Sequence, residues 1–390
     1  MTSKHWRGIA LPQIFNNPVF GSSGLTLTGV KSFNTFCALL TSGLSAESKA
    51  LIHELDLTNI DESLYENVRP DWLKIVVSNC VNLRSLKVSG CGFMSDEVVA
   101  EASESVHLSL RKLDVSQTQH LSNSSIVKLL CIFPGIVSLD LSHLPLVNDD
   151  VMHAVSTHCV LLGELRANFT LASDVSVYYL LSLEHLQSLS FTGCTNITDE
   201  FAKFFSSGPI AASLRELAVG KNMRLTDAVI EDLSQSPLPK TLRILDIGGC
   251  TNIKLAPSAF GVFSSFIGQT VEKLTISYPI FNNRDKRFIE DLHRFQNLER
   301  LILTDIDEQC DGDFLIRVIH SLHKLQKLAL FRIPFECDSI ITEMYTEKKR
   351  SAHMLIDDSF VDYISQKFKE RNVSVTLRMQ PESDIAEIRA

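Results

Sequence analysis

The chain of 390 residues contains nine cysteines, whose thiolates could bind a metal, form disulfides or act as nucleophiles. Their number is odd, and no Cys-x-x-Cys pair occurs. Cys91, Cys194 and Cys250 lie far apart, without the close paired spacing of zinc ligands. The sequence therefore favours reduced, buried thiols with a structural role, and metal or redox chemistry is the alternative interpretation.

Two pairs of adjacent acids, Asp149/Asp150 and Asp199/Glu200, have the residue type that general acid and base catalysis uses. Neither pair has an accompanying His or nucleophile at the same end of its segment, and helix capping explains both pairs better. The chain also has no glycine-rich phosphate loop, His-Glu-x-x-His helix or Gly-x-Ser-x-Gly elbow. We therefore predict that the protein is not an enzyme and needs no cofactor.

An apolar repeat of the form Leu-x-x-Leu-x-Leu must position these cysteines and acids. Ten intervals separate Leu55 from Leu328, so the mean period is about 27 residues, which is typical of leucine-rich repeats. The central apolar residues of the copies are Leu55, Leu86, Leu113, Leu139, Leu165, Leu189, Leu217, Leu245, Leu274, Leu301 and Leu328.

A repeat of this length holds one short strand and one helix, and neither buries its apolar face without a neighbouring repeat. The sequence therefore predicts an α/β leucine-rich-repeat solenoid of about eleven or twelve repeats. We expect a curved horseshoe with a parallel sheet on its concave side and helices on its convex side. Such a sheet is a surface for binding another macromolecule, so the fold favours binding over catalysis.

Polar residues recur at fixed distances after the central leucines. Five residues on, we expect a small polar side chain to turn inward and pair with loop backbone groups, at Cys91, Thr118, Thr170, Cys194, Asn222 and Cys250. Further on, Ser, Thr or Asn, in several copies followed by Asp, predicts a helix start, because the polar residue caps free amides and the acid complements the helix dipole. These predicted caps are Ser95, Ser122, Asn148, Thr198 and Thr226.

The segments SGCGFMSDE and TGCTNITDE carry the motif SGC-x-x-(Met/Ile)-(Ser/Thr)-Asp or its close variant. This combination resembles the cysteine-containing leucine-rich repeats of fungal F-box substrate receptors, over about residues 51 to 335. Related repeats also occur in proteins without an F-box, such as the antagonist-of-mitotic-exit type and a nucleotide-excision-repair subunit. The resemblance implies a substrate-recognition subunit related to Skp-cullin-F-box ubiquitin ligases. The alternative is an inhibitor or assembly factor in cell-cycle control or DNA repair.

The N-terminal stretch SKHWRGIALPQIFNNPVFGSS is similar to the segment that joins an F-box to its repeats. The matching residues are Trp6, Leu11, Pro12, Pro18 and Phe20. The resemblance implies that Trp6, Leu11 and Pro12 are the remnant of an adaptor-docking surface. We expect the F-box itself to lie before Met1 or to have been lost, and Skp adaptor and cullin to be partners if it exists upstream. Alternatively, Trp6 and Phe20 cap the exposed core of the first repeat.

The predicted domain organisation has four parts. Residues 1–30 form the N-terminal remnant and cap, 31–335 the leucine-rich repeats, 336–380 a C-terminal cap and 381–390 a tail. The sequence of the C-terminal cap predicts two polar helical stretches and then a closing strand at Val373, Val375 and Leu377.

Strand alternation identifies the candidate binding residues, because the neighbours of inward leucines point out from the concave sheet. Acids dominate the early strands, whereas the last strands are basic and apolar. The predicted protein partner therefore has a basic segment over the early repeats and an acidic or phosphorylated, partly apolar segment over the late ones. The candidate residues are Asp56, Asp114, Asp140, Arg166, Asp246, Lys273, Arg300, Ile302, Lys327 and Phe331.

The net charge of −9 argues against general nucleic-acid binding, so no direct nucleic-acid partner is expected. The sequence has no run of 18 or more apolar residues and no apparent signal peptide, which predicts a protein without a membrane partner in the cytoplasm or nucleus. We expect the isolated chain to be a monomer.

Overall fold

The computed structural model divides the chain into two compact units, Met1–Leu186 (unit 1) and Gln187–Ala390 (unit 2). The sequence predicted one repeat domain over 31–335, and the division falls inside it. In a solenoid each repeat contacts only its neighbours, so a row of repeats divides without any change in local architecture. The structure describes residues 15–20, 28–60, 67–206, 209–255, 257–277, 290–304, 321–325, 327–331 and 353–356.

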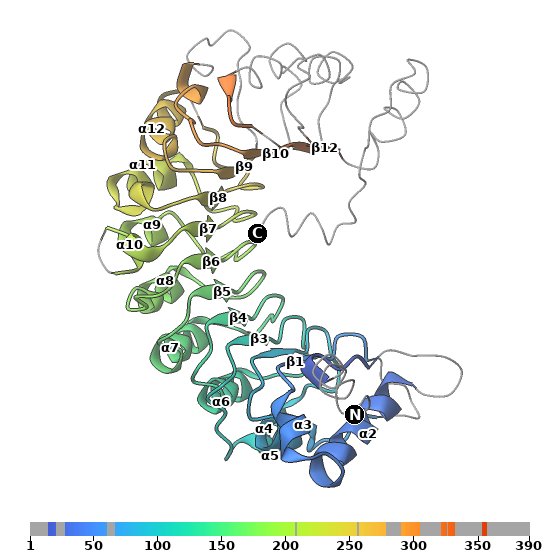
Figure 1. Cartoon of the computed structure of the whole chain (residues 1–390). Coiled ribbons are helices and arrows are strands. Elements are labelled where there is room, and N and C mark those ends of the chain that lie inside the picture. The colour runs from blue at the N-terminus through green and yellow to red at the C-terminus, as the bar shows by residue number, and fades with distance from the viewer. Residues whose placement is uncertain are drawn as a thin grey trace, which may run out of the picture. The chain divides into compact units, whose positions relative to one another are not determined.

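Unit 1 alternates short strands with helices (Figure 1). Its strands pair in parallel, each with the next along the chain. They are β1 (Glu54–Asp56), β2 (Ser85–Lys87), β3 (Lys112–Asp114), β4 (Ser138–Asp140) and β5 (Glu164–Arg166). The described helices are α2 (Gly29–Ser42), α3 (Ala46–Ala50), α4 (Trp72–Asn79), α5 (Asp96–Ala102), α6 (Asn123–Ile132), α7 (Asp149–His158) and α8 (Asp174–Leu180).

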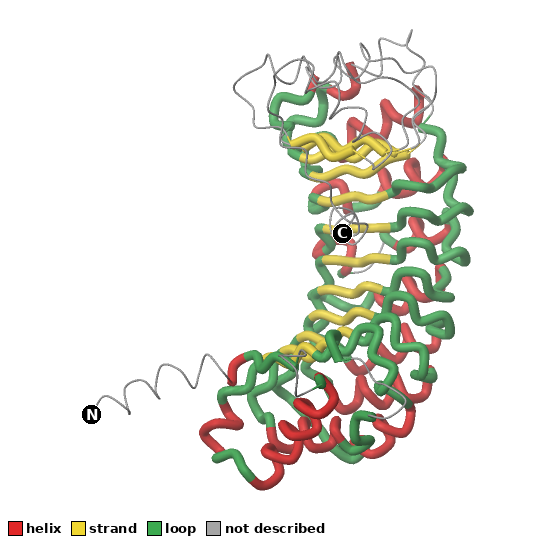
Figure 2. Tube along the Cα trace, turned by 90° about the vertical axis from the view of Figure 1, so that its right-hand side faces the viewer, coloured by secondary structure: helices red, strands yellow, loops and turns green. Residues whose placement is uncertain are grey.

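Unit 2 continues the same parallel pattern, and Figure 2 shows its strands along one face and its helices along the other. The strands are β6 (Ser188–Ser190), β7 (Glu216–Ala218), β8 (Ile244–Asp246), β9 (Lys273–Ser277), β10 (Arg300–Thr304), β11 (Lys327–Phe331) and β12 (His353–Ile356). The described helices are α9 (Glu200–Phe204), α10 (Ile210–Ser213), α11 (Asp227–Gln235), the 3₁₀ helix η1 (Leu238–Lys240) and α12 (Pro257–Ile267).

The central leucines form one buried row in each unit. Leu55 pairs with Leu86 in unit 1, and Leu189 pairs with Leu217 in unit 2. The row continues to Leu165 in unit 1 and to Leu301 in unit 2, and every one of these leucines is at most 2% exposed. The predicted strand register and the α/β leucine-rich-repeat solenoid are therefore confirmed.

The polar residues five positions after the leucines turn inward, as predicted. Four of them contact carbonyl oxygens of a strand or loop, which helps to satisfy buried backbone acceptors. The contacts are Cys91 Sγ to Leu57 O (3.3 Å), Cys250 Sγ to Val219 O (3.3 Å), Thr170 Oγ1 to Ala167 O (2.8 Å) and Asn222 Nδ2 to Phe191 O (2.9 Å).

The predicted helix starts are confirmed for α5, α6, α7 and α11, which follow Ser95, Ser122, Asn148 and Thr226. Helix α9 begins one residue later than expected, and Asp199 rather than Thr198 is its N-cap. The cap side chains of α6 and α11 accept backbone hydrogen bonds, from Ser125 N and Ala228 N.

Four aspartates at helix starts have a role that the sequence pattern did not predict. Each accepts a hydrogen bond from a backbone N–H at or shortly before the start of the next repeat's helix. Burial acts to raise the pKa of Asp96, but hydrogen bonds from Ser122 and Ser125 outweigh it and hold the pKa below its usual value. These aspartates therefore join successive repeats as well as complementing helix dipoles. The backbone contacts are Ser122 N to Asp96 (2.8 Å), Ser173 N to Asp149 (2.9 Å), Thr226 N to Asp199 (2.8 Å) and Lys254 N to Asp227 (2.8 Å).

An aromatic cluster closes the N-terminal end of the repeats. Phe20 packs edge-on against Phe33 of α2 at 5.1 Å between ring centroids, and Phe33 packs against Trp72 of α4 at 5.7 Å. Phe20 is 5% exposed and Trp72 is fully buried. The interpretation of Phe20 as a cap on the first repeat is therefore confirmed, whereas Trp6, Leu11 and Pro12 lie outside the described residues.

The C-terminal prediction was partly wrong. His353–Ile356, expected within a polar helical stretch, is strand β12 and pairs in parallel with β11. The open edge of β11 offers unpaired backbone groups, and the short run HMLI satisfies them by extending the sheet. The predicted closing strand at Val373, Val375 and Leu377 lies outside the described residues.

Among the helices that the structure describes, none is both long and apolar enough to cross a membrane.

Candidate protein-binding surface

The outward side chains of β1 to β5 form a surface that we call the strand face of unit 1. The predicted early acids lie on it, but their carboxylates already accept hydrogen bonds within the turns that follow the strands. Each one accepts a hydrogen bond from the backbone N–H two residues further on, which fixes the end of the strand. The contacts are Thr58 N to Asp56 (3.1 Å), Ser116 N to Asp114 (3.0 Å) and Ser142 N to Asp140 (2.8 Å). These acids have a structural role that the sequence analysis did not assign.

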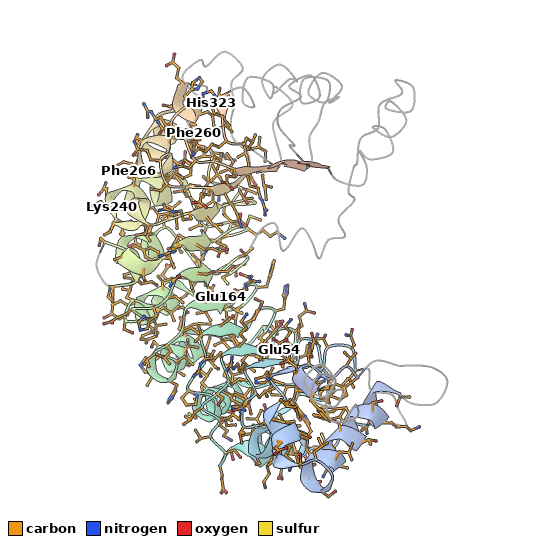
Figure 3. The ribbon with its side chains drawn as sticks, in the orientation of Figure 1. Glu54, Glu164, Lys240, Phe260, Phe266 and His323 are labelled. Atoms are coloured by element: carbon orange, nitrogen blue, oxygen red, sulfur yellow. The ribbon has the colours of Figure 1, made fainter. Side chains whose placement is uncertain are left out.

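Basic side chains partly neutralise the same face. Lys87 Nζ lies 3.9 Å from Asp56 Oδ2, and Arg166 Nε lies 3.0 Å from Glu164 Oε1. Figure 3 labels Glu54 and Glu164, which come from β1 and β5. The face is thus a mixed array of half-exposed charges rather than the acidic surface that the sequence suggested.

Asp140 lies near the middle of this array and differs electrostatically from its neighbours. Burial of its carboxylate raises the pKa of Asp140, although hydrogen bonds from Ser142 oppose the shift. Asp114, which precedes it in register, adds to the increase through like charge.

Two predicted binding residues of unit 2 are not available to a partner. Asp246 is 3% exposed, and its Oδ1 accepts a hydrogen bond from Gly248 N at 2.8 Å. Ile302 is 0% exposed, so its apolar surface is already removed from water. The prediction that these side chains face solvent was wrong, because alternation along a strand gives direction but not accessibility.

Lys273 and Arg300 remain as candidates on the strand face of unit 2. They are partners in register on β9 and β10, and both side chains are half-exposed. Lys327 occupies the same position on β11, and Phe331 ends that strand. The side chains of Lys327 and Phe331 lie outside what the structure describes, so their binding roles stay predictions.

The cysteines fit the structural interpretation. Six of the seven in the described part of the chain are buried, and Cys131 is exposed. Its Sγ lies 3.8 Å from His158 Nε2. No group of three or more potential metal ligands occurs in the described ranges. Burial raises the pKa to about 12 for the thiols of Cys37, Cys80, Cys159 and Cys250.

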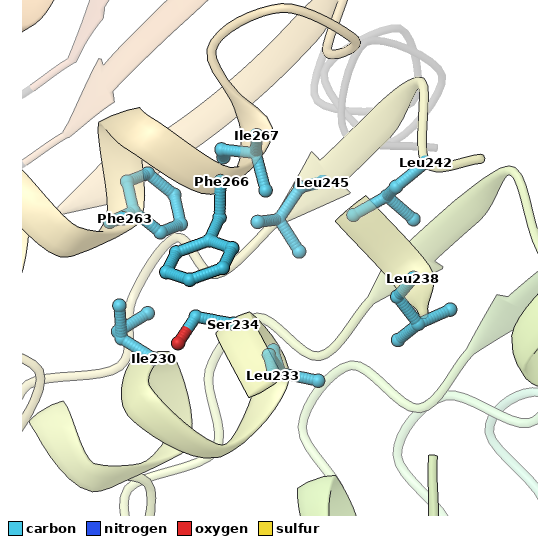
Figure 4. A pocket seen from close by; sticks show the side chains of 9 residues that line it. All are labelled: Ile230, Leu233, Ser234, Leu238, Leu242, Leu245, Phe263, Phe266 and Ile267. Carbon is cyan, nitrogen blue, oxygen red and sulfur yellow. The ribbon is translucent and has the colours of Figure 1, made fainter. Parts of the chain in front are cut away.

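A small apolar pocket lies on the helix side of unit 2, between α11, η1 and α12 (Figure 4). Its volume of about 20 Å³ is comparable to the space for a single water, which is too small for an organic ligand. Ser234, the one polar residue in its lining, donates its hydroxyl to Glu231 O at 2.6 Å. This pocket is a packing defect rather than a binding site.

An aromatic pair that the repeat pattern did not predict lies on the loops after β4 and β5. The rings of His143 and Phe169 stack at 4.6 Å with an interplanar angle of 17°. Both residues occupy the fourth position after a central leucine, where Gly90, Gln117, Gly193, Lys221 and Gly249 stand in other repeats. Aligning the repeats would have revealed two aromatic rings at a position that is otherwise glycine or polar.

No protein-family model matches the chain. It is similar to a chain in the crystal structure of the yeast Rad7 and Elc1 complex, with a TM-score of 0.51 and 16% identity over 85% of this chain and 90% of that one. An internalin of Listeria monocytogenes gives a TM-score of 0.38, with 15% identity over 78% of this chain and 95% of that one. The leucine-rich repeat-containing protein LegL7 of Legionella pneumophila gives 0.45, with 17% identity over 74% and 93%. At these identities the likeness concerns the fold alone.

Proposed function

We propose that the protein is a non-catalytic scaffold that binds a target protein on its strand face. The observation that carries this proposal is the in-register pair Lys273 and Arg300 on β9 and β10. Both are half-exposed, and neither forms an ion pair with a described residue. A fixed guanidinium beside an ammonium suits a carboxylate or phosphate group, so the expected target segment is acidic or phosphorylated.

We further propose that the scaffold is the substrate-recognition subunit of a ubiquitin ligase related to the Skp-cullin-F-box type, in the cytoplasm or nucleus. Two observations support this. The repeat motif SGCGFMSDE resembles that of F-box receptors. The solved structure of Rad7 is a complex with another protein, Elc1.

A second candidate function is an inhibitor or assembly factor that acts without a ligase. The burial of Phe20 favours it, because Phe20 belongs to the stretch that resembles the F-box linker. Its ring lies 5.1 Å from that of Phe33 and 5.2 Å from that of Phe36, within the N-terminal aromatic cluster. A side chain used in this way stabilises the first repeat and has no surface left for an adaptor.

The target site is tested with the double variant Lys273→Glu and Arg300→Glu, with proteins cross-linked to the chain in cell extract identified by mass spectrometry. The expected result is at least about a tenfold loss of the wild-type partners with an unchanged unfolding midpoint. The matched control is Lys87→Glu with Lys112→Glu, which reverses two charges on unit 1. Equal capture by the wild type and the unit 2 variant would refute the site.

The two candidate functions are separated by purified Skp adaptor and cullin. A stable complex with the gene product, measured by size-exclusion chromatography, supports the ligase subunit. Absence of any complex with either protein, while the gene product still binds its target, supports the inhibitor or assembly factor.

A further inference from the structure

A second exposed surface lies on the loops that follow β4 and β5 in unit 1. We name His143, Leu146, Phe169 and Leu171 the loop patch. Leu146 is 61% exposed, Leu171 46% and Phe169 39%, and His143 is also exposed. These residues do not belong to the strand face, so the inference is independent of the proposed target site.

The loop patch is one continuous surface because the two loops are joined along their backbones. His143 N donates to Asn168 O at 2.7 Å, and Leu171 N donates to Val147 O at 2.8 Å. These contacts hold the two loops against each other, and the stacked rings bring His143 and Phe169 together. The four exposed residues thus come from two adjoining loops of successive repeats.

The backbone at the loop patch adopts a left-handed turn that recurs after the strands of other repeats. His143 has φ 59° and Phe169 has φ 55°, in the left-handed region where a bulky residue is unfavourable. The same turn holds glycine at Gly90, Gly193 and Gly249, and it holds Gln117 and Lys221 at φ 58° and 59°. The turn therefore does not require an aromatic ring at this position.

The charge around the loop patch indicates its partner. Outside β4 and β5, residues 141–163 and 167–186 contain four Asp or Glu and no Lys or Arg. Asp150 and Asp174 lie in the first turns of α7 and α8, which directly follow the two loops. Aromatic and aliphatic anchors with an acidic surround suit a partner that presents an apolar side chain between basic residues.

We propose that the loop patch binds a protein segment in which a large apolar side chain is flanked by Lys or Arg. The anchor packs against the stacked rings and the two leucines, and the basic flanks lie over the acids of the α7 and α8 first turns. The acids set the approach and the orientation, while the apolar contact supplies most of the affinity.

The test uses a random peptide library displayed on phage, selected on the purified full chain. The expected result is enrichment of peptides that combine Trp, Phe or Leu with Lys or Arg. A labelled peptide made from the enriched consensus should lose at least about tenfold in affinity for Phe169→Gly, measured by fluorescence anisotropy. Enrichment without basic residues, or no enrichment, would overturn the proposal.

The variant Phe169→Gly also separates binding from folding, because glycine accepts the positive φ at no steric cost. Its unfolding midpoint should equal or exceed that of the wild type. The matched control is Gln117→Gly, at the same turn position with φ 58°, which should leave peptide affinity unchanged. Equal affinity for the wild type and Phe169→Gly refutes the site. A concentration-dependent dimer in sedimentation, absent in Phe169→Gly, would instead assign the patch to a second copy of the chain and overturn the peptide proposal.

Discussion

The strand faces of the two units share a backbone register but differ in what they offer a partner. In unit 1 the residues that follow the central leucines are Asp56, Lys87, Asp114, Asp140 and Arg166, and none of them is fully buried. In unit 2 the corresponding residues are Ser190, Ala218, Asp246, Thr275 and Ile302, and all of them are buried.

The difference teaches that strand alternation and accessibility are separate properties. Asp140 stays partly exposed whereas Asp246, the same residue type at the same repeat position, is buried, so the surroundings decide accessibility. On the described strands of unit 2 the accessible charges therefore precede the central leucines, at Glu216, Lys273 and Arg300. A partner would meet a broad mixed array on unit 1 and, on unit 2, a narrow row that is basic at Lys273 and Arg300.

The largest expected effect tests whether the cores of the two units are equivalent despite their different faces. Leu139→Ala in unit 1 and Leu245→Ala in unit 2 should each lower the free energy of unfolding by about 2 to 5 kcal/mol, because each leucine is 1% exposed. Urea denaturation followed by circular dichroism measures both losses. A much smaller loss in one unit would show that its described register is wrong.

The next effect concerns the aspartates that join successive repeats, one from each unit. Asp149→Ala and Asp199→Ala should each destabilise the fold by about 1 to 3 kcal/mol, because each leaves the next helix cap without its acceptor. Asp150→Ala is the matched control. Asp150 is exposed and accepts only a 3.3 Å contact from Asn148, so its removal should change little. Equal losses of stability for Asp149→Ala and Asp150→Ala would show that these acids act only through the helix dipole and not by joining repeats.

A smaller expected effect is the pH dependence of the free energy of unfolding that Asp140 of unit 1 causes. Burial raises the pKa of Asp140, so the folded state holds this proton more tightly than the unfolded chain. The stability that Asp140 contributes is therefore complete below its unfolded pKa of about 3.9 and is lost as pH rises through the folded value.

Asp140→Asn should consequently be more stable than the wild type at neutral pH. The amide oxygen still accepts from Ser142 N, and no buried charge remains. The advantage should shrink on acidification towards about pH 3. Thermal unfolding at several pH values measures it, and a variant whose advantage is independent of pH would exclude the charge as its cause.

The smallest expected effect concerns the rate at which a reagent modifies cysteine thiols in the two units, and it involves no change in stability. Cys131 of unit 1 is exposed, whereas Cys194 and Cys250 of unit 2 are buried. Iodoacetamide should therefore modify Cys131 in the native protein well before those two, as measured by peptide mass mapping. Comparable rates at Cys131 and Cys250 would show that unit 2 opens under native conditions.

Much of the fold follows from local sequence pattern. The leucine at every strand centre, the inward Cys91 and Asn222 and most helix starts were predictable, because each depends on a period or on residues close in the chain. The candidate site was less predictable. Alternation identified the strand faces, but it did not reveal that Asp246 and Ile302 are buried or that Asp56 caps its own turn.

The sequence by itself determined the repeat class, the strand register and the identity of the inward residues, since a solenoid is specified by contacts between like positions in neighbouring repeats. The tertiary structure alone decided what depends on contacts between different positions. It placed Phe20 against Phe33, joined Asp149 to Ser173 and stacked His143 on Phe169. It also decided which outward side chains reach water, because accessibility depends on the size of neighbours that no single repeat contains.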